Sequence, residues 1–183
     1  MTLDDLREAL PDKEWLKSTQ NATEITRLFT RADRQLGRDE IAPGWTAGQA
    51  GRALLLGGQS PEQIRELYDH GDAAEKLAVL KALPLLPIKD AGVPLLLDAL
   101  RTNDTRLVAA ALGPYARHLD AATWRQGVIK IVFMGVPLAE VEDLDERADA
   151  ELAQMLRSLA DERAAAGREM SADATALLNR LEA

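Results

Sequence analysis

The sequence contains no cysteine, and only two of its 183 residues are histidine. Without cysteine there is no disulfide framework, no thiolate zinc site and no cysteine nucleophile. Gly-rich phosphate loops, the HisGluXaaXaaHis pair and the nucleophile elbow are absent as well. His70 and His118 fall near the ends of expected helices, where an imidazole interacts favourably with the helix dipole. We therefore expect no catalytic residue, no metal site and no cofactor, and the sequence favours a protein that is not itself an enzyme.

Long apolar runs and an excess of positive charge are also missing. No stretch reaches the ~18 apolar residues of a membrane span, and residues 1–9 are acidic, unlike a signal peptide. Lys and Arg total 22 against 30 Asp and Glu, a formal net charge of -8, which disfavours a general nucleic-acid binder. We expect a cytoplasmic protein with no membrane insertion and no nucleic-acid partner.

The composition that remains is typical of packed helices. Aromatic residues make up 4% of the chain and hydrophobic residues 46%, with Leu and Ala abundant. Capping boxes mark helix starts at Thr46 with Gln49, Ser60 with Gln63 and Asp72 with Glu75. We predict an all-α fold: one domain spanning residues 1–183, with about ten short antiparallel helices in an irregular HEAT-like α/α array that lacks a strict sequence period.

Two segments are harder to assign than the others. Residues 126–134 are rich in β-branched side chains, which would also suit a strand, but no partner strand is evident, so we predict a helix. Residues 38–44 contain Pro43 and Gly44 and are predicted to form a loop. Between residues 140 and 151 the acidic side chains could hold a hard cation or form a solvated loop. The spacing lacks the pattern of a calcium-binding loop and favours the loop.

Several basic residues fall where the helical pattern expects apolar ones. In the helix expected to begin at Asp149, Arg163 continues the buried stripe of leucines, and Lys130 lies in an otherwise apolar helix. A buried guanidinium needs a carboxylate or several carbonyls as partners. Arg163 is therefore either a structural residue or part of a pocket with Arg147 and Lys130.

We expect the basic residues to converge. The prediction is that one region holds all five cations, that Arg163 pairs with a carboxylate, and that two aromatic side chains lie close by. The cations are Arg101, Lys130, Arg147, Arg163 and Arg168, and the aromatic residues are Tyr115 and Trp124.

Short motifs in the C-terminal half occur in the order typical of a known family. They are Arg101-Thr102-Asn103, Gly113-Pro114-Tyr115, Trp124 with Gln126 and Lys130, Gly135-Val136-Pro137-Leu138, Leu144 with Arg147 and Ala148, Glu151-Leu152-Ala153 with Met155-Leu156, and Glu162-Arg163 with Ala165-Ala166-Gly167-Arg168. On these residues the chain resembles the EboA family, most strongly over residues 101–168 and more weakly upstream to about residue 40. Residues 1–40 are expected to be variable N-terminal helices.

The resemblance implies a function rather than a reaction. It implies a secondary-metabolism role in moving a precursor, isoprenoid-linked or aromatic, from the cytoplasm towards the periplasm. It also implies partners among the other Ebo cluster proteins, including a UbiA-like membrane prenyltransferase that would hold the chain beside the inner membrane. We expect a non-catalytic adaptor or carrier. The alternative is an enzyme or binding protein that acts on an anionic metabolite through Lys130, Arg147 and Arg163.

Candidate binding residues are the polar and aromatic positions that match the family pattern: Arg101, Asn103, Tyr115, Trp124, Lys130, Arg147, Arg163 and Arg168. The chain also departs from that pattern. The family usually has Asn where this chain has Gly113, Arg125 and Asp149, and Trp where it has Ala164. A site that depended on those amide or indole groups would be altered here.

Overall fold

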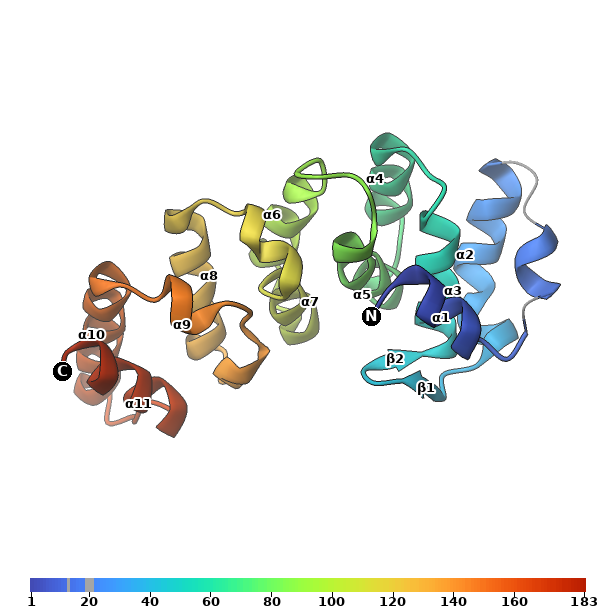
Figure 1. Cartoon of the computed structure of the whole chain (residues 1–183). Helices are drawn as coiled ribbons and strands as arrows, with labels where there is room; N and C mark the ends of the chain where they lie inside the picture. Colours follow the sequence, from blue (N-terminus) through green and yellow to red (C-terminus); the bar gives the residue numbers. More distant parts are fainter. Residues whose placement is uncertain (13, 19–21) are drawn as a thin grey trace. The chain divides into compact units, whose positions relative to one another are not determined.

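The computed structural model describes residues 1–12, 14–18 and 22–183 (Figure 1). These residues form eleven α-helices, four short 3-10 helices and one small hairpin, which confirms the predicted all-α class. The chain divides into two compact units, Met1–Leu95 and Leu96–Ala183, and its single-domain organisation stays a prediction. None of the described helices combines the length and the apolar character that crossing a membrane requires.

Three helices of the N-terminal unit start where the sequence predicts. Thr46, Ser60 and Asp72 each cap a helix, and Gln49, Gln63 and Glu75 bond back to them. The elements are α1 (Leu3–Ala9), η1 (Glu14–Ser18), α2 (Ala22–Leu36), β1 (Glu40–Ala42), β2 (Trp45–Thr46), α3 (Ala47–Leu56), α4 (Pro61–Asp69), α5 (Ala73–Ala82) and η2 (Leu83–Leu85).

The expected loop at residues 38–44 is wrong in part. Glu40–Ala42 pairs antiparallel with Trp45–Thr46, and Gly44 has a left-handed φ of 72° in the turn between them. Lys81 holds this turn, because its ammonium donates to the Gly44 carbonyl and to Gln49 Oε1 and lies 4.7 Å from the centre of the Trp45 ring. The strands are too short to show an alternating pattern in the sequence.

Helix α3 is the centre of the N-terminal unit and is in contact with α1, α2 and α5. In Figure 1 it runs between α2 and α5. Its close approach to α2 depends on glycine. A Cβ at Gly48 would lie 3.0 Å from the Asp33 backbone, and one at Gly51 would lie 2.4 Å from the Leu36 side chain. These small residues bring the buried α3 side chains within reach of α2.

The C-terminal unit begins within α6, because the boundary between the units falls after Leu95. Its elements are α6 (Val93–Arg101), α7 (Thr105–Ala111), η3 (Pro114–His118), α8 (Ala121–Phe133), η4 (Leu138–Glu140), α9 (Leu144–Arg147), α10 (Ala150–Ala165) and α11 (Ala172–Leu181). The helix predicted over residues 126–134 is confirmed as part of α8. Part of the expected acidic loop is instead the single helical turn α9.

Helix α8 contacts both α7 and α10 and carries the largest buried side chain of the unit, Trp124, which is 1% exposed. Gly127 lets the neighbouring chain approach, since a Cβ there would lie 2.8 Å from Leu112 and 3.3 Å from Leu100. Helices α6, α8 and α10 end at residues 101, 133 and 165, two intervals of 32 residues. The sequence shows no matching strict period.

Candidate functional site

Arg147, the last residue of α9, binds the end of another helix. Its two terminal nitrogens donate to the carbonyls of Ala116 (2.7 Å) and Leu119 (2.9 Å), at the end of η3. Its guanidinium carbon lies 4.7 Å from the centre of the Trp124 ring, within the range of a cation–π contact. Burial lowers the pKa of Arg147, and Asp143 and Asp120 oppose that shift.

Lys130 makes the same kind of contact from α8. Its ammonium donates to the carbonyl of Leu100 at 2.7 Å, and Leu100 is the second-last residue of α6. The last carbonyls of a helix have no intrahelical donor, and the C-terminal end carries partial negative charge. Lys130 therefore satisfies an open carbonyl and interacts favourably with the α6 dipole.

Arg163 binds the end of α8. One terminal nitrogen donates to the carbonyl of Phe133 at 2.9 Å and approaches that of Val132 at 3.4 Å. The guanidinium also lies 5.7 Å from the centre of the Phe133 ring. Among the described residues no carboxylate pairs with Arg163, so the predicted carboxylate partner is wrong and backbone carbonyls take its place.

The three cations therefore share a role but not a pocket. Each cation binds carbonyls at a helix end. The residues that carry these carbonyls lie 28 to 31 positions before the cation in the chain. From Trp124, beneath Arg147, to Phe133, beside Arg163, α8 rises about 13 Å at ~1.5 Å per residue. We name Lys130, Arg147 and Arg163 the helix-end cations.

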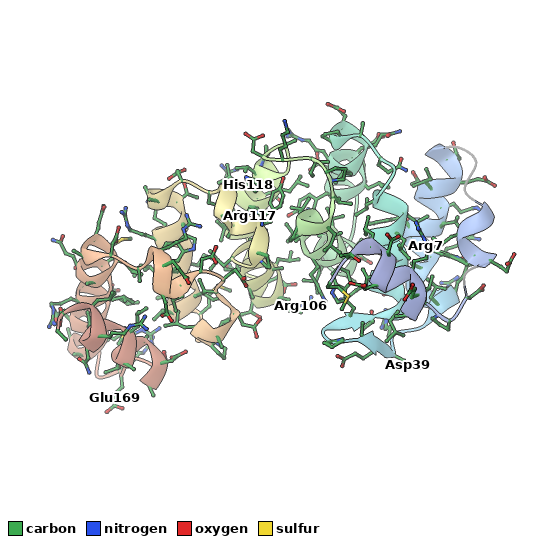
Figure 2. All side chains as sticks on the ribbon, in the orientation of Figure 1. Arg7, Asp39, Arg106, Arg117, His118 and Glu169 are labelled. Carbon is green, nitrogen blue, oxygen red and sulfur yellow. The ribbon has the colours of Figure 1, made fainter. Side chains whose placement is uncertain are left out.

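The other candidate residues are divided between surface and core. Arg101, Asn103 and Arg168 are exposed, whereas Tyr115 is 2% exposed. The Tyr115 ring lies 4.7 Å, centre to centre, from that of His118, the last residue of η3, which is labelled in Figure 2. The structure thus brings Trp124 and Arg147 together, next to the η3 turn that contains Tyr115. That any of the eight candidate residues binds a ligand or partner stays a prediction.

Two positions at which the chain departs from the family pattern contact each other. Arg125 donates to both carboxylate oxygens of Asp149, with Nε 2.9 Å from Oδ1 and a terminal nitrogen 2.5 Å from Oδ2. The same guanidinium pairs with Glu151 at 2.7 Å. The hydrogen bond from Arg125, with those from the backbone of α10, holds the pKa of Asp149 below its ordinary value. An ion pair thus joins α8 to the start of α10 at two positions where the resemblance implies Asn.

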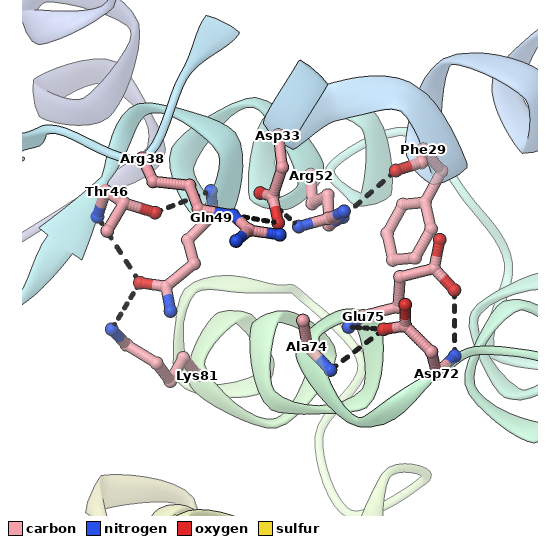
Figure 3. Close-up of polar contacts among 10 residues, drawn as sticks. All are labelled: Phe29, Asp33, Arg38, Thr46, Gln49, Arg52, Asp72, Ala74, Glu75 and Lys81. Atoms are coloured by element: carbon pink, nitrogen blue, oxygen red, sulfur yellow. Dashed lines mark hydrogen bonds and ion pairs between the residues drawn. The ribbon is translucent and has the colours of Figure 1, made fainter. Parts of the chain in front are cut away.

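Sequence reasoning missed the cation that is most deeply buried among the described residues. Arg52 of α3 is 3% exposed and donates to the Phe29 carbonyl at 3.0 Å and to Asp33 Oδ1 at 2.7 Å (Figure 3). Its guanidinium also lies 5.6 Å from the centre of the Phe29 ring. A signal was present, because Arg52 is the only charged residue in a helix that otherwise consists of Ala, Gly, Gln and Leu. A charge in such a helix requires a partner.

The C-terminal unit also contains an open hollow of about 660 Å³, which we name the acidic groove. Its lining combines six apolar side chains with five carboxylates and one guanidinium. It is lined by Leu138, Ala139, Val141, Glu142, Asp143, Leu144, Asp145, Glu146, Asp173, Ala176, Leu177 and Arg180.

Two contacts fix the shape of the acidic groove. Arg180 of α11 pairs with Asp145 of α9 at 2.6 Å, and Asp173 accepts the backbone N–H of Leu138 at 2.8 Å. That N–H is the main reason that the pKa of Asp173 is lowered. Over the described residues no group of three or more His, Asp or Glu side chains is arranged to hold a metal ion. The groove therefore offers mainly a negatively charged surface, with small apolar patches between the carboxylates.

Comparison with known proteins gives one match. A family model described as "Metabolite traffic protein EboA" matches residues 17–179. Searches of curated proteins and of solved structures found no match. The matched segment contains the helix-end cations, Arg52 and the whole lining of the acidic groove except Arg180.

Proposed function

The chain belongs to the EboA family, and from that premise we propose that it is a non-catalytic adaptor in a metabolite-trafficking assembly. In this proposal it works at the cytoplasmic side of the inner membrane. The assembly moves a precursor, isoprenoid-linked or aromatic, from the cytoplasm towards the periplasm. The adaptor's role is to bind a partner protein rather than to transform the precursor.

The observation that carries the proposal is the use of the helix-end cations. Lys130, Arg147 and Arg163 each donate to backbone carbonyls at a different helix end. Because these donors are already engaged within the fold, the contacts support an adaptor over an enzyme or a binding protein that acts through those three residues. The hollow that the C-terminal unit does present is acidic, which disfavours an anionic ligand there.

The acidic groove fits a basic, amphipathic segment of a partner protein. The accessible apolar side chains Ala139, Leu144 and Ala176 would contact its apolar face, and the carboxylates of the groove would attract its Lys and Arg side chains. Cytoplasmic loops of membrane proteins carry an excess of Lys and Arg. A basic cytoplasmic loop of a UbiA-like prenyltransferase, or of another Ebo cluster protein, is therefore the partner that we propose.

The test is capture of a defined partner rather than of an unknown protein. The tagged chain is co-expressed with the membrane prenyltransferase of its own gene cluster, solubilised in detergent and purified. We expect co-purification that weakens as salt increases, because surface charge attraction is screened. Replacing Asp145 and Glu146 of the groove with lysine should abolish it.

A matched pair of variants provides the control. Asp161 and Glu162 are exposed acidic residues of α10 that do not line the groove, so their replacement with lysine changes the net charge equally. Equal capture by the groove variant and this control would contradict docking in the groove. Turnover of an isoprenoid or aromatic precursor by the purified chain would contradict the adaptor function itself.

A further inference from the structure

A second cavity, of about 210 Å³, lies in the N-terminal unit between α2, α4 and the start of α5. Apolar side chains on two of these helices form much of its wall, among them Ile25 and Phe29 of α2 and Leu67 of α4. Its volume equals about seven water molecules at ~30 Å³ each, which suits a ligand of roughly seven to ten non-hydrogen atoms.

Glu75 lines the same cavity and is the only acidic residue of the described chain that is buried, at 7% exposed. Its Oε2 accepts the backbone N–H of Asp72 at 2.9 Å, which completes the capping box of α5. Among the described residues no group donates to Oε1, and no cation forms an ion pair with Glu75. The carboxylate therefore has one oxygen available to a ligand.

Capping alone does not account for a buried charge at this position. The boxes of α3 and α4 close with Gln49 and Gln63, which are neutral and more exposed. Asp5 closes the box of α1 with a charge, but Asp5 is exposed. Only Glu75 combines charge, burial and a cavity. Since a buried carboxylate without a cation is costly, a glutamine would cap α5 at lower cost.

The aromatic ring of Phe29 lines the same cavity as Glu75. Figure 3 shows the Glu75 carboxyl pointing from α5 toward the Phe29 ring, and both residues line the cavity. Arg52, the buried cation of this unit, is already bound to the Phe29 carbonyl and to Asp33. A carboxylate oxygen beside an aromatic ring is a favourable position for an ammonium group, which can donate to the first and rest against the second.

We propose that this cavity binds a small primary amine with an apolar body. The ammonium donates to Glu75 Oε1 and contacts the Phe29 ring, and the body packs against Ile25 and Leu67. This site goes beyond the proposed adaptor function, because it takes a small molecule and is formed by residues of the N-terminal unit only. Its success or failure is independent of whether a partner docks in the acidic groove.

Phenethylamine is the probe, because its nine non-hydrogen atoms suit the estimated space, and binding to the full chain is measured by calorimetry. Phenethyl alcohol keeps the shape and one donor without the charge, and phenylacetate reverses the charge. We expect the amine to bind in a saturable way, the alcohol more weakly, and the acid not to bind. Equal binding of phenylacetate, or no saturable binding of the amine, would overturn the proposal.

Two glutamine variants locate the site. Glu75→Gln keeps the capping geometry that Gln49 and Gln63 provide elsewhere, and it should lower the affinity for the amine by about tenfold to a hundredfold. Glu66→Gln is the control, since Glu66 lines the same cavity but is exposed. The affinity of this variant for the amine should stay within about twofold of wild type. Unchanged affinity in Glu75→Gln would refute the assignment.

A third variant keeps the proposal testable if Glu75→Gln does not fold. Thr30 is exposed and lines the cavity, so Thr30→Trp should obstruct it without altering the buried core. Loss of amine binding in this variant, with an unchanged circular dichroism spectrum, supports the site. Retained binding would place the amine elsewhere on the chain and contradict the proposal.

Discussion

Arg52 of the N-terminal unit and the helix-end cations of the C-terminal unit are stabilised in different ways. Arg52 in the first unit has a carboxylate partner, Asp33, as well as a carbonyl and an aromatic ring. The helix-end cations of the second unit bind carbonyls alone, and two of them also lie against an aromatic ring. In the first case two full charges compensate each other, whereas in the second a full charge is balanced by helix dipoles.

The difference determines what remains when the cation is removed. Without Arg52 a largely buried carboxylate loses its closest partner. Without a helix-end cation only neutral carbonyls lose a donor, and some of these can be solvated. The loss in the free energy of unfolding should therefore be larger when Arg52 is removed than when a helix-end cation is removed.

The largest effect should come from Arg52→Ala. It leaves Asp33, 17% exposed, with only the exposed Arg38 as a partner, and it opens space between α2 and α3. We expect a loss of about 3 to 5 kcal/mol in the free energy of unfolding, the range for breaking a buried ion pair. Urea denaturation followed by circular dichroism measures it. Arg38→Ala removes the exposed partner of the same carboxylate and should cost less than about 1 kcal/mol.

A double variant sharpens this first step. Arg52→Met combined with Asp33→Leu removes both charges and keeps apolar volume, so it should recover much of the stability that Arg52→Ala loses. If the double variant is as unstable as the single one, the charge pairing is not the source of the loss. The packing of the Arg52 side chain against Phe29 would then be responsible.

Arg147→Ala should have a smaller effect. Two carbonyls lose a charged donor and the Trp124 ring loses its cation, and we expect about 2 kcal/mol from these losses together. Arg147→Lys keeps the charge, but an ammonium cannot reproduce the two-nitrogen geometry of the guanidinium. It should therefore recover only part of the lost stability. Arg168→Ala, at an exposed position, is the control and should stay within about 0.5 kcal/mol of wild type. A loss as large as that of Arg52→Ala would remove the distinction between Arg52 and the helix-end cations.

Arg163→Met should cost about 1 kcal/mol, the least of the three arginine variants. Methionine keeps contact with the Phe133 ring, and the hydrogen bond to the Phe133 carbonyl is lost. The change also removes Arg163 Nε, which is buried without a hydrogen-bond partner, and this offsets part of the loss. A cost of 3 kcal/mol or more on thermal unfolding would indicate a carboxylate partner after all.

The smallest effect concerns pH and the Arg125–Asp149 pair. Because the folded-state pKa of Asp149 is lowered, its contribution to stability is present above the ordinary value of 3.8 and is lost as pH falls through the lowered value. Asp149→Asn removes that contribution. The drop in the urea midpoint between pH 7 and about pH 3 should be smaller in the variant than in wild type. An unchanged drop would mean that other carboxylates account for all of the acid sensitivity.

Much of the fold was predictable because its signals are local. The capping boxes beginning at Thr46, Ser60 and Asp72 are short patterns whose chemistry is complete within four residues. The helix over residues 126–134 was predictable from the lack of a partner strand. The hairpin at Glu40–Thr46 was missed because three residues of strand carry too little pattern to read.

The partners of the basic residues could not be predicted in the same way. Helical periodicity places Arg163 on a particular face, but it does not say which segment, about 30 residues away, lies against that face. Carboxylate side chains can be identified in a sequence, and we therefore predicted a carboxylate partner for Arg163. Backbone carbonyls are present at every residue, and a sequence does not mark which of them is left open at a helix end.

The spacing of the helix-end cations has a consequence for the newly synthesised chain. The carbonyls of Leu100, Leu119 and Phe133 each bind a side chain made 28 to 30 residues later. At roughly 5 to 20 residues per second, the ribosome needs about 2 to 6 seconds to supply it. During that interval water must solvate the open carbonyls. Each helix end is therefore completed only after about 30 further residues have been synthesised. The C-terminal unit should therefore gain its final stability stepwise, in the order in which Lys130, Arg147 and Arg163 leave the exit tunnel.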